Sequence, residues 1–79
     1  SLYRTEFYAD KGNWYLPKEE AFESQVQIRY LHNGSTAQVT PLRDGRVHVE
    51  FSEPQLSITP GQSAVFYVDD CIVGGGWIE

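Results

Sequence analysis

The 79-residue sequence has no methionine, one cysteine and no basic residue after Arg46. Its lone cysteine, Cys71, has no partner for an internal disulfide, and small secreted domains usually carry several such bridges. The cysteine content therefore favours a reducing compartment, and we expect a cytoplasmic protein. Because there is no initiator methionine and no unstructured lead before "SLYRTEFYAD", we expect the chain to be a piece of a longer polypeptide.

Long apolar runs are also absent. No stretch approaches the ~18 residues needed to span a bilayer, and no basic segment followed by an apolar one opens the chain as a secretion signal would. We therefore expect no membrane contact. The length allows one domain, residues 1–79, because a chain this short buries only roughly 60–65% of the surface that its unfolded form exposes.

Positive charge is scarce, with six Lys and Arg against eleven Asp and Glu and a net charge of -5. Contacts of Lys and Arg with phosphate supply most of the non-specific affinity of proteins for nucleic acids, so this balance argues against independent nucleic-acid binding. All six basic residues lie within the first 46 positions. We expect the second half of the chain to contact partners through neutral donors, backbone amides or apolar surface.

Alternation of apolar and polar residues, the pattern of a half-buried strand, dominates wherever a period is readable. In residues 22–31 it places Phe22, Val26 and Tyr30 inward and Arg29 outward. Further strands are predicted at residues 35–42, 46–51, 63–68 and 71–73, and short strands at 2–8 and 13–16. Within residues 1–20, which lead into the predicted fold, aromatic and charged residues mix without clean alternation.

Turn residues separate these strands. Asp44-Gly45 predicts a tight hairpin because this pair tolerates the positive φ angles that such turns need. Two prolines interrupt "SEPQLSITPGQ", and Pro60-Gly61 predicts a type II turn over residues 59–62. Asp69-Asp70 predicts another turn between strands. We therefore predict an all-β fold, a small closed or partly closed antiparallel barrel of five to seven strands, since closure removes exposed sheet edges.

The strand at residues 63–68 is apolar on both faces, because Ala64 and Phe66 alternate with Val65 and Tyr67. In a lone barrel the outer face would meet water. We expect Val65, Tyr67 or Trp77 to contribute to an apolar patch that a neighbouring domain or partner covers.

No residue pattern indicates catalysis, a metal site or a cofactor site. Cys71 has no histidine near it in sequence to lower its pKa, and we predict that it is a small apolar filler at a strand end. His32 and His48 do not fall at zinc-ligand spacings with Cys71. The run Gly74 to Gly76 lacks the spacing of a phosphate loop, so it predicts close packing of backbone against a neighbour.

Three segments carry a family resemblance: "VQIRY", "DGRVHVEFSEPQLSITPGQSAVFY" and "CIVGGGWIE". They resemble the C-terminal domain of the tRNA-specific 2-thiouridylases, transferases formerly labelled tRNA methyltransferases. The resemblance implies a barrel similar to the second domain of elongation factors. It also implies a parent enzyme that activates the wobble uridine of tRNA with ATP and replaces its 2-oxygen by sulfur from a cysteine persulfide.

The ATP-binding loop and the catalytic cysteines of such enzymes belong to parts outside this sequence, so the resemblance implies that the 79-residue chain alone is inactive. The implied partners are tRNA, the rest of the parent chain and a persulfide-carrying sulfur donor protein. The implied tRNA contacts are Arg29, Tyr30 and Gln62. Three alternatives stay open: a solvated Arg29, a core Tyr30 and a Gln62 that caps its turn. The alternative function is a structural docking module that packs on the catalytic domains or on the sulfur donor.

Overall fold

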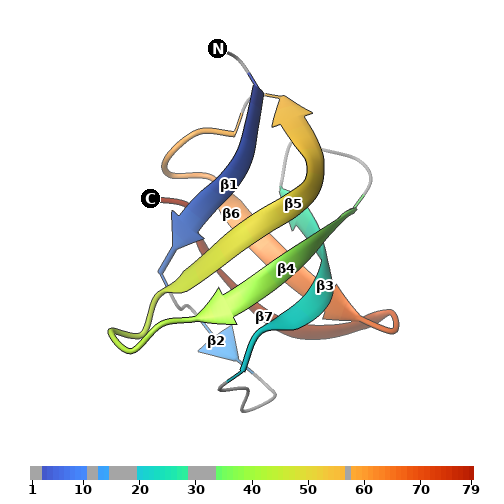
Figure 1. The fold of residues 1–79 in the computed structure, drawn as a ribbon. Helices are drawn as coiled ribbons and strands as arrows, with labels where there is room; N and C mark the ends of the chain where they lie inside the picture. Colours follow the sequence, from blue (N-terminus) through green and yellow to red (C-terminus); the bar gives the residue numbers. More distant parts are fainter. Residues whose placement is uncertain (1–2, 11–12, 15–19, 29–33, 57) are drawn as a thin grey trace.

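The computed structural model describes residues 3–10, 13–14, 20–28, 34–56 and 58–79, and the strands account for most of them (Figure 1). The described residues form seven strands: β1 (Tyr3–Ala9), β2 (Asn13–Trp14), β3 (Phe22–Ile28), β4 (Ser35–Pro41), β5 (Val47–Leu56), β6 (Ser63–Val68) and β7 (Cys71–Trp77). No helix is found within the described ranges. The predicted all-β fold is therefore confirmed.

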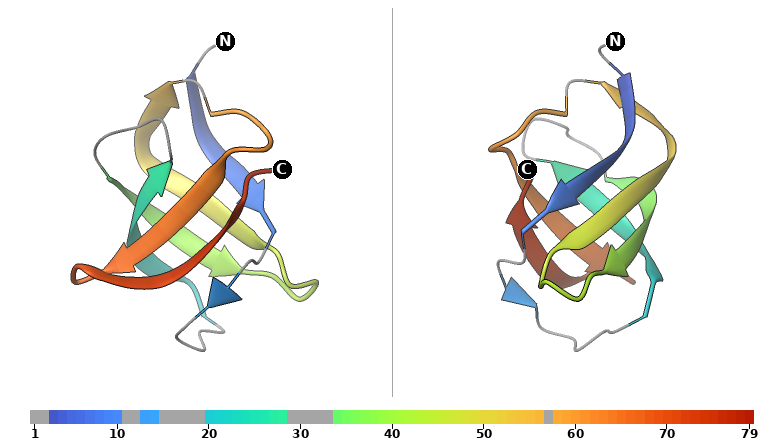
Figure 2. Two further views of the ribbon diagram at one scale, coloured as in Figure 1. Left: turned by 180° about the vertical axis from the view of Figure 1, so that it is seen from behind. Right: turned by 60° about the vertical axis from the view of Figure 1, so that its left-hand side comes forward.

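The strands form one antiparallel sheet in the order β1-β5-β4-β3-β6-β7-β2. The sheet curls until β1 meets the end of the chain, where Ala9 bridges Ile78 (Figure 2). The Asp10 N–H donates to the Trp77 carbonyl at 3.0 Å, and the Glu79 N–H donates to the Tyr8 carbonyl at 2.8 Å. These bonds join the two sides of the sheet, so the barrel is closed along part of its seam.

The predicted alternation is confirmed in β3 over residues 22–28 and in β5 over residues 47–51. In β3 the buried side chains are Ser24, Val26 and Ile28, and in β6 they are Ala64 and Phe66. The core comprises Phe7, Ala9, Val26, Ile28, Ala37, Val39, Val47, Val49, Phe51, Ile58, Ala64, Phe66, Val73 and Ile78. Because every sheet strand except the two-residue β2 contributes to this list, the core lies inside the curl of the sheet.

Strand β5 runs further than the sequence predicted. The stretch after residue 51 was expected to break at Pro54, yet β5 continues through it to Leu56. On β1, which pairs with β5, Arg4 lies opposite Gln55 and Glu6 lies opposite Glu50. Thr5 is therefore the single β1 residue opposite residues 51–54 of β5. A bulge of this kind bends a strand and tolerates proline, because the missing N–H would have no ladder partner there.

The hairpin turns also differ in type from the prediction. The β4–β5 turn lies at Asp44-Gly45 as predicted, but only Gly45 has a positive φ, at 91°. The Gly45 N–H donates to the Leu42 carbonyl at 3.2 Å, and the Leu42 N–H to the Arg46 carbonyl at 2.8 Å. This is a type I turn closed by a glycine bulge.

The two-residue hairpin with two positive φ angles is instead at Asp69-Asp70, with φ of 49° and 66°. Val68 pairs directly with Cys71 across this turn. Two successive left-handed residues are the conformation of a type I′ turn, which matches the twist of the strands that it joins.

Strand β7 continues through the three glycines, where the sequence predicted a strand of only residues 71–73. The predicted close packing is confirmed. A Cβ on Gly74 would collide with the Trp14 ring, and one on Gly76 would collide with the Asp10 carbonyl oxygen. Trp14 stacks on Phe66 with ring centroids 5.2 Å apart, so Gly74 makes room for an aromatic ring that covers the core.

Candidate nucleic-acid interface

Two of the three predicted contact residues, Arg29 and Tyr30, lie outside the described residues. Their described flanks fix where that segment leaves and re-enters the sheet. Ile28 pairs with Ala64, and Ser35 pairs with Val26. The end of β3 and the start of β4 therefore lie beside the start of β6, which follows directly after Gln62.

Gln62 closes the turn that the sequence predicted. Pro60 and Gly61 occupy its central positions, Gly61 has φ of 91°, and the Gln62 N–H lies 3.4 Å from the Thr59 carbonyl. These features match a type II turn. The Gln62 side chain folds back so that its Oε1 accepts a hydrogen bond from the Thr59 N–H at 3.0 Å. The oxygen of the Gln62 amide therefore caps the turn, as one of the open alternatives predicted.

The other half of the amide, Nε2, carries two N–H donors on a half-buried side chain. The backbone holds it in place on the seam of the barrel. The Gly61 N–H donates to the Ile78 carbonyl at 2.7 Å, and the Ile78 N–H donates to the Gln62 carbonyl at 2.8 Å. Gln62 is therefore a neutral donor on a turn that is fixed to the end of the chain.

Further polar side chains lie where β1 begins and β5 ends, at the upper end of the barrel in Figure 1. Arg4 is exposed and pairs with Gln55. Gln55 is held on both sides, since its Oε1 accepts from Ser35 Oγ at 3.1 Å and its Nε2 donates to the Glu53 carbonyl at 2.9 Å. Sequence reasoning did not single out Arg4 or Gln55, because neither stands in a readable alternation.

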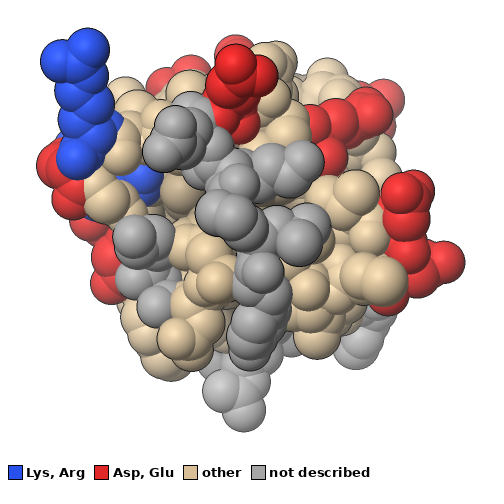
Figure 3. Space-filling view, turned by 90° about the horizontal axis from the view of Figure 1, so that it is seen from below, with Lys and Arg blue, Asp and Glu red and all other residues tan. Residues whose placement is uncertain are grey.

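Two other described arginines, Arg43 and Arg46, belong to the β4–β5 hairpin at the opposite end of the barrel (Figure 1), and Figure 3 shows Lys and Arg side chains gathered at one edge of that end. The guanidinium of Arg46 is bound by two carboxylates. Its Nε lies 2.8 Å from Asp44 Oδ2 and its NH1 lies 2.8 Å from Glu79 Oε1. These hydrogen bonds raise the pKa of Arg46, with Glu79 the larger cause, and the guanidinium also lies 5.2 Å from the centre of the Tyr8 ring.

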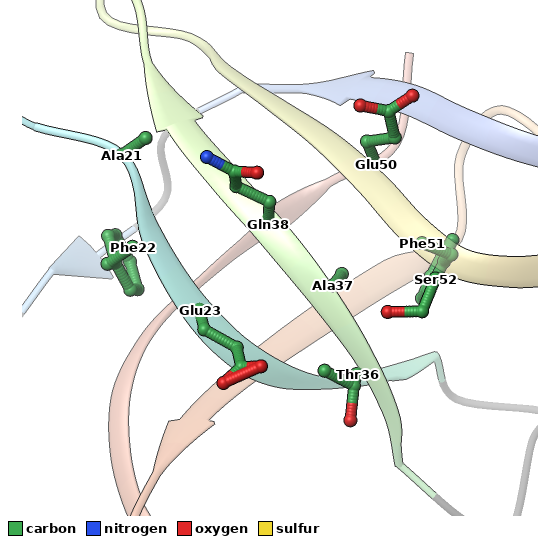
Figure 4. Close-up of a pocket in the computed structure, with 9 residues that line it drawn as sticks. All are labelled: Ala21, Phe22, Glu23, Thr36, Ala37, Gln38, Glu50, Phe51 and Ser52. Carbon is green, nitrogen blue, oxygen red and sulfur yellow. The ribbon is translucent and has the colours of Figure 1, made fainter.

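The outer surface of β1, β5, β4 and β3 is acidic. Cross-strand pairing puts Glu6 beside Glu50, Glu50 beside Gln38 and Gln38 beside Glu23. A shallow hollow of about 520 Å³ lies over this row, with the side chains of Glu23, Gln38 and Glu50 around it (Figure 4). Three carboxylates in one row repel phosphate, so this face does not suit nucleic acid.

The outer surface of β6 and β7 is apolar, as predicted. Trp77 is 55% exposed and Ile72 is 50% exposed, while Val65 and Tyr67 are half-buried. Ile72 was not predicted to take part. It joins the outer face because the register shifts between Phe66 and Tyr67, which brings Ile72 opposite Tyr67.

Cys71 and His48 are described residues with reactive or metal-binding side chains. Cys71 lies at a strand end as predicted, but it is exposed where an apolar filler was expected to be buried. The reason is its place directly after the Asp69-Asp70 turn. His48 contacts Glu6 at 3.4 Å. A search of the described residues finds no cluster of three His, Cys, Asp or Glu arranged to hold a metal ion.

No helix with the length and apolar character needed to cross a membrane occurs among the described residues.

Comparison with known proteins identifies the family of this barrel. A family model described as the aminomethyltransferase beta-barrel domain matches residues 4–78. The tRNA-specific 2-thiouridylase MnmA of Geotalea uraniireducens is 44% identical over 80 residues, which cover the whole chain and 21% of that protein. MnmA 2 of Syntrophus aciditrophicus is 42% identical over 80% of the chain and 24% of that protein. MnmA 1 of Clostridium botulinum strain Langeland is 48% identical over 99% of the chain and 22% of that protein.

The chain thus spans about a fifth to a quarter of the length of these relatives. The family model covers nearly all of it, and the matching β-barrel agrees with the observed sheet. The chain therefore belongs to the family of aminomethyltransferase beta-barrel domains and corresponds to the C-terminal domain of the tRNA-specific 2-thiouridylases.

Proposed function

We propose that this barrel is a tRNA-contacting accessory domain of a parent enzyme that transfers sulfur to the wobble uridine of tRNA in the cytoplasm. The chemistry, with ATP as its cofactor, takes place on other domains of the parent, and a persulfide-carrying protein supplies the sulfur. The barrel positions the substrate and is inactive alone. Arg29, Tyr30 and Gln62 are the proposed contacts.

The observation that carries this proposal is the state of the Gln62 amide. Its oxygen is used inside the turn, so the group left for a ligand is a donor, and RNA presents acceptors on its phosphates, sugars and bases. The turn is tied to Ile78 by two backbone hydrogen bonds, so the donor is held in place before RNA arrives.

The distribution of charge supports contact at this end of the barrel. The acidic row of Glu6, Glu50 and Glu23 disfavours phosphate on the outer surface of β1, β5, β4 and β3. Arg46 is engaged by two carboxylates at the other end. The exposed Arg4 and the segment with Arg29 adjoin strand ends on the side of Gln62, where a backbone phosphate would meet fewer carboxylates.

The test uses the full-length parent enzyme. It distinguishes the role of the Gln62 amide oxygen, which caps the turn, from that of the N–H donors, which would contact tRNA. Gln62→Glu keeps an oxygen that caps Thr59 and replaces the donor by a negative charge, so thermal stability should stay near that of wild type while tRNA binding weakens. Thr59→Glu adds a negative charge to the same exposed turn and leaves the Gln62 side chain in place, so it is the control for the effect of charge alone. Gln62→Ala removes both the donor and the cap on Thr59, and loss of the donor should cost tRNA binding about 0.5–1.5 kcal/mol, the net worth of one hydrogen bond.

Arg29→Ala is the second arm of this test. A phosphate contact should be lost, so the salt dependence of tRNA binding should fall by about one counterion. Gln62→Ala should leave the salt dependence unchanged, and ATP binding should be unaffected in both variants. If Gln62→Glu binds tRNA as well as wild type does, Gln62 only caps its turn and the proposed contact is wrong.

A second candidate function is a docking module with little RNA contact. The observation that favours it is the apolar outer surface of β6 and β7, where Trp77 and Ile72 are about half exposed. The net charge of -5 favours it as well. The two functions use neighbouring but separate surfaces, because Trp77 projects from the outer surface of β7 and Gln62 closes the turn before β6.

A further inference from the structure

We propose that the apolar outer surface of β6 and β7 is the face on which the barrel packs against the remaining part of its own parent polypeptide. We call it the β6–β7 face, formed by Ser63, Val65, Tyr67, Ile72, Gly75 and Trp77. This inference rests on the proposal that the chain is one domain of a longer enzyme. It names the surface and the partner of the docking role, and it does not depend on RNA contact at Gln62.

Strand pairing gathers the apolar side chains of this face. Trp77 lies opposite Ser63, Gly75 opposite Val65, and Ile72 opposite Tyr67. A hollow of about 260 Å³ opens between them, lined by Asn13, Ser63, Ala64, Val65, Ile72, Gly74, Gly75, Gly76 and Trp77.

Gly75 has no side chain to fill this hollow, and Trp77 and Ile72, both about half exposed, lie on either side of Gly75 along β7. The hollow therefore has the size and lining for an apolar side chain from another segment, the arrangement found at the centre of protein interfaces.

The charge of the face favours protein over RNA. None of the described residues that line the hollow is Lys, Arg, Asp or Glu. The neighbouring strand β3 adds Gln25 and Gln27, which pair with Tyr67 and Val65 and are also neutral. RNA on this surface would place phosphates where no described cation meets them, whereas depletion of charge with exposed aromatic residues is typical of the core of a protein interface.

The size of the face favours a partner on the same chain. Four half-exposed apolar side chains offer on the order of 300 Å², less than the ~800 Å² per partner of a stable interface between separate proteins. A domain on the same polypeptide binds at an effective concentration in the millimolar range, so a smaller face suffices. The relatives are four to five times as long as this chain, so their chains contain such domains.

The test is hydroxyl-radical labelling of the intact gene product, read residue by residue by mass spectrometry. Tyr3 is the internal control, because it is 60% exposed and lies on β1, whereas Trp77 is 55% exposed in the barrel by itself. We expect Trp77 to be protected relative to Tyr3 without tRNA and at both low and high protein concentration. Ile72→Asp should raise labelling of Trp77 about fivefold by undocking the face, and Ser52→Asp, exposed on β5, should not.

Three results would overturn the proposal. The first is a rate of Trp77 labelling as high as its 55% exposure in the barrel alone predicts, which would mean that nothing covers Trp77. Protection that appears only with tRNA would assign the face to RNA, and protection that appears only at high concentration would assign it to a second copy. The wild-type comparison decides the question even if Ile72→Asp fails to fold. A failed tRNA contact would show in the affinity of Gln62→Glu and leave this labelling result unchanged.

Discussion

Gln62 shows how one side chain can serve both structure and binding. Sequence reasoning left open whether it caps its turn or contacts RNA. The structure uses Oε1 for the cap, at 3.0 Å from the Thr59 nitrogen, and this fixes the direction in which the amide lies. Alanine substitution at this position therefore changes two interactions at once, and only a variant that keeps the oxygen can isolate the donor.

Asp44 gives a prediction on pH at the level of one residue. The backbone N–H of Arg46, and then its guanidinium, hold the pKa of Asp44 below the ordinary value of 3.8. A carboxylate whose pKa is lower in the folded state stabilises the fold above the unfolded value, and this contribution is lost as pH falls through the folded value. Asp44→Asn should therefore melt at a lower temperature than wild type at pH 7.

As the pH falls below the ordinary pKa of an aspartate toward pH 2, the difference in melting temperature should shrink, because Asp44 becomes protonated in the folded state as well. The measurement is thermal unfolding followed by circular dichroism at several pH values. Glu53→Gln, exposed on β5, removes one negative charge that forms no ion pair with the described residues, and it serves as control. An equal difference in melting temperature at pH 7 and pH 2 would mean that the charge of Asp44 contributes nothing.

Among the elements, strand β3 and the positions of the hairpin turns were predictable from the sequence, because each depends on only a few neighbouring residues. Alternation over residues 22–28 and the pair Asp44-Gly45 each act within a few positions. The types of the two hairpin turns were not predictable, since Asp69-Asp70 adopts positive φ only because Val68 and Cys71 pair directly. The continuation of β5 through Pro54 depends on the bulge opposite Thr5, a contact between distant parts of the chain.

The two hairpin turns should respond in opposite ways to glycine and alanine. Asp70 has φ of 66° and Asp69 has φ of 49°, a conformation that costs roughly 1 kcal/mol for a residue with a Cβ. Asp70→Gly should therefore raise the free energy of unfolding by up to about 1 kcal/mol. Gly45→Ala should lower it by about 1 kcal/mol, because Gly45 has φ of 91° and its Cβ would enter open space, which leaves backbone strain as the only cost.

Urea denaturation of the 79-residue chain measures both effects. Asp44 and Arg46 should keep their ion pair in Gly45→Ala, which can be checked by a normal acid dependence. If Asp70→Gly is destabilising, the carboxylate of Asp70 makes a contribution that its backbone conformation does not reveal.

At the scale of the whole molecule, the candidate site depends on how the barrel closes. Sequence patterns identified the strands but not the seam, because Ala9–Ile78 and the hydrogen bonds around it join the two ends of the chain. The seam places Gln62 next to Ile78 and puts Trp77 on the adjacent outer surface. The predicted positions of Arg29 and Tyr30 lie outside the described residues, so their proximity to Gln62 stays a prediction.

Closure of the barrel should depend on two of the three consecutive glycines far more than on the third. A Cβ on Gly74 would meet the Trp14 ring that covers the core, and one on Gly76 would meet the Asp10 carbonyl at the seam. Neither neighbour can move without loss of packing or of the Asp10–Trp77 backbone hydrogen bond. Gly74→Ala and Gly76→Ala should each cost about 3 kcal/mol or more, a large part of the ~4–12 kcal/mol expected for a domain of this size.

Gly75→Ala is the matched control, because its Cβ would meet only the Ala64 carbonyl oxygen, at 3.2 Å, and would otherwise point to the outer surface. A shift of a few tenths of an ångström relieves that contact, so the loss should stay near 1 kcal/mol. Urea denaturation of the three alanine variants gives the ranking directly. Equal losses at all three positions would mean that neither the Trp14 ring nor the Asp10 carbonyl at the seam sets the requirement for glycine.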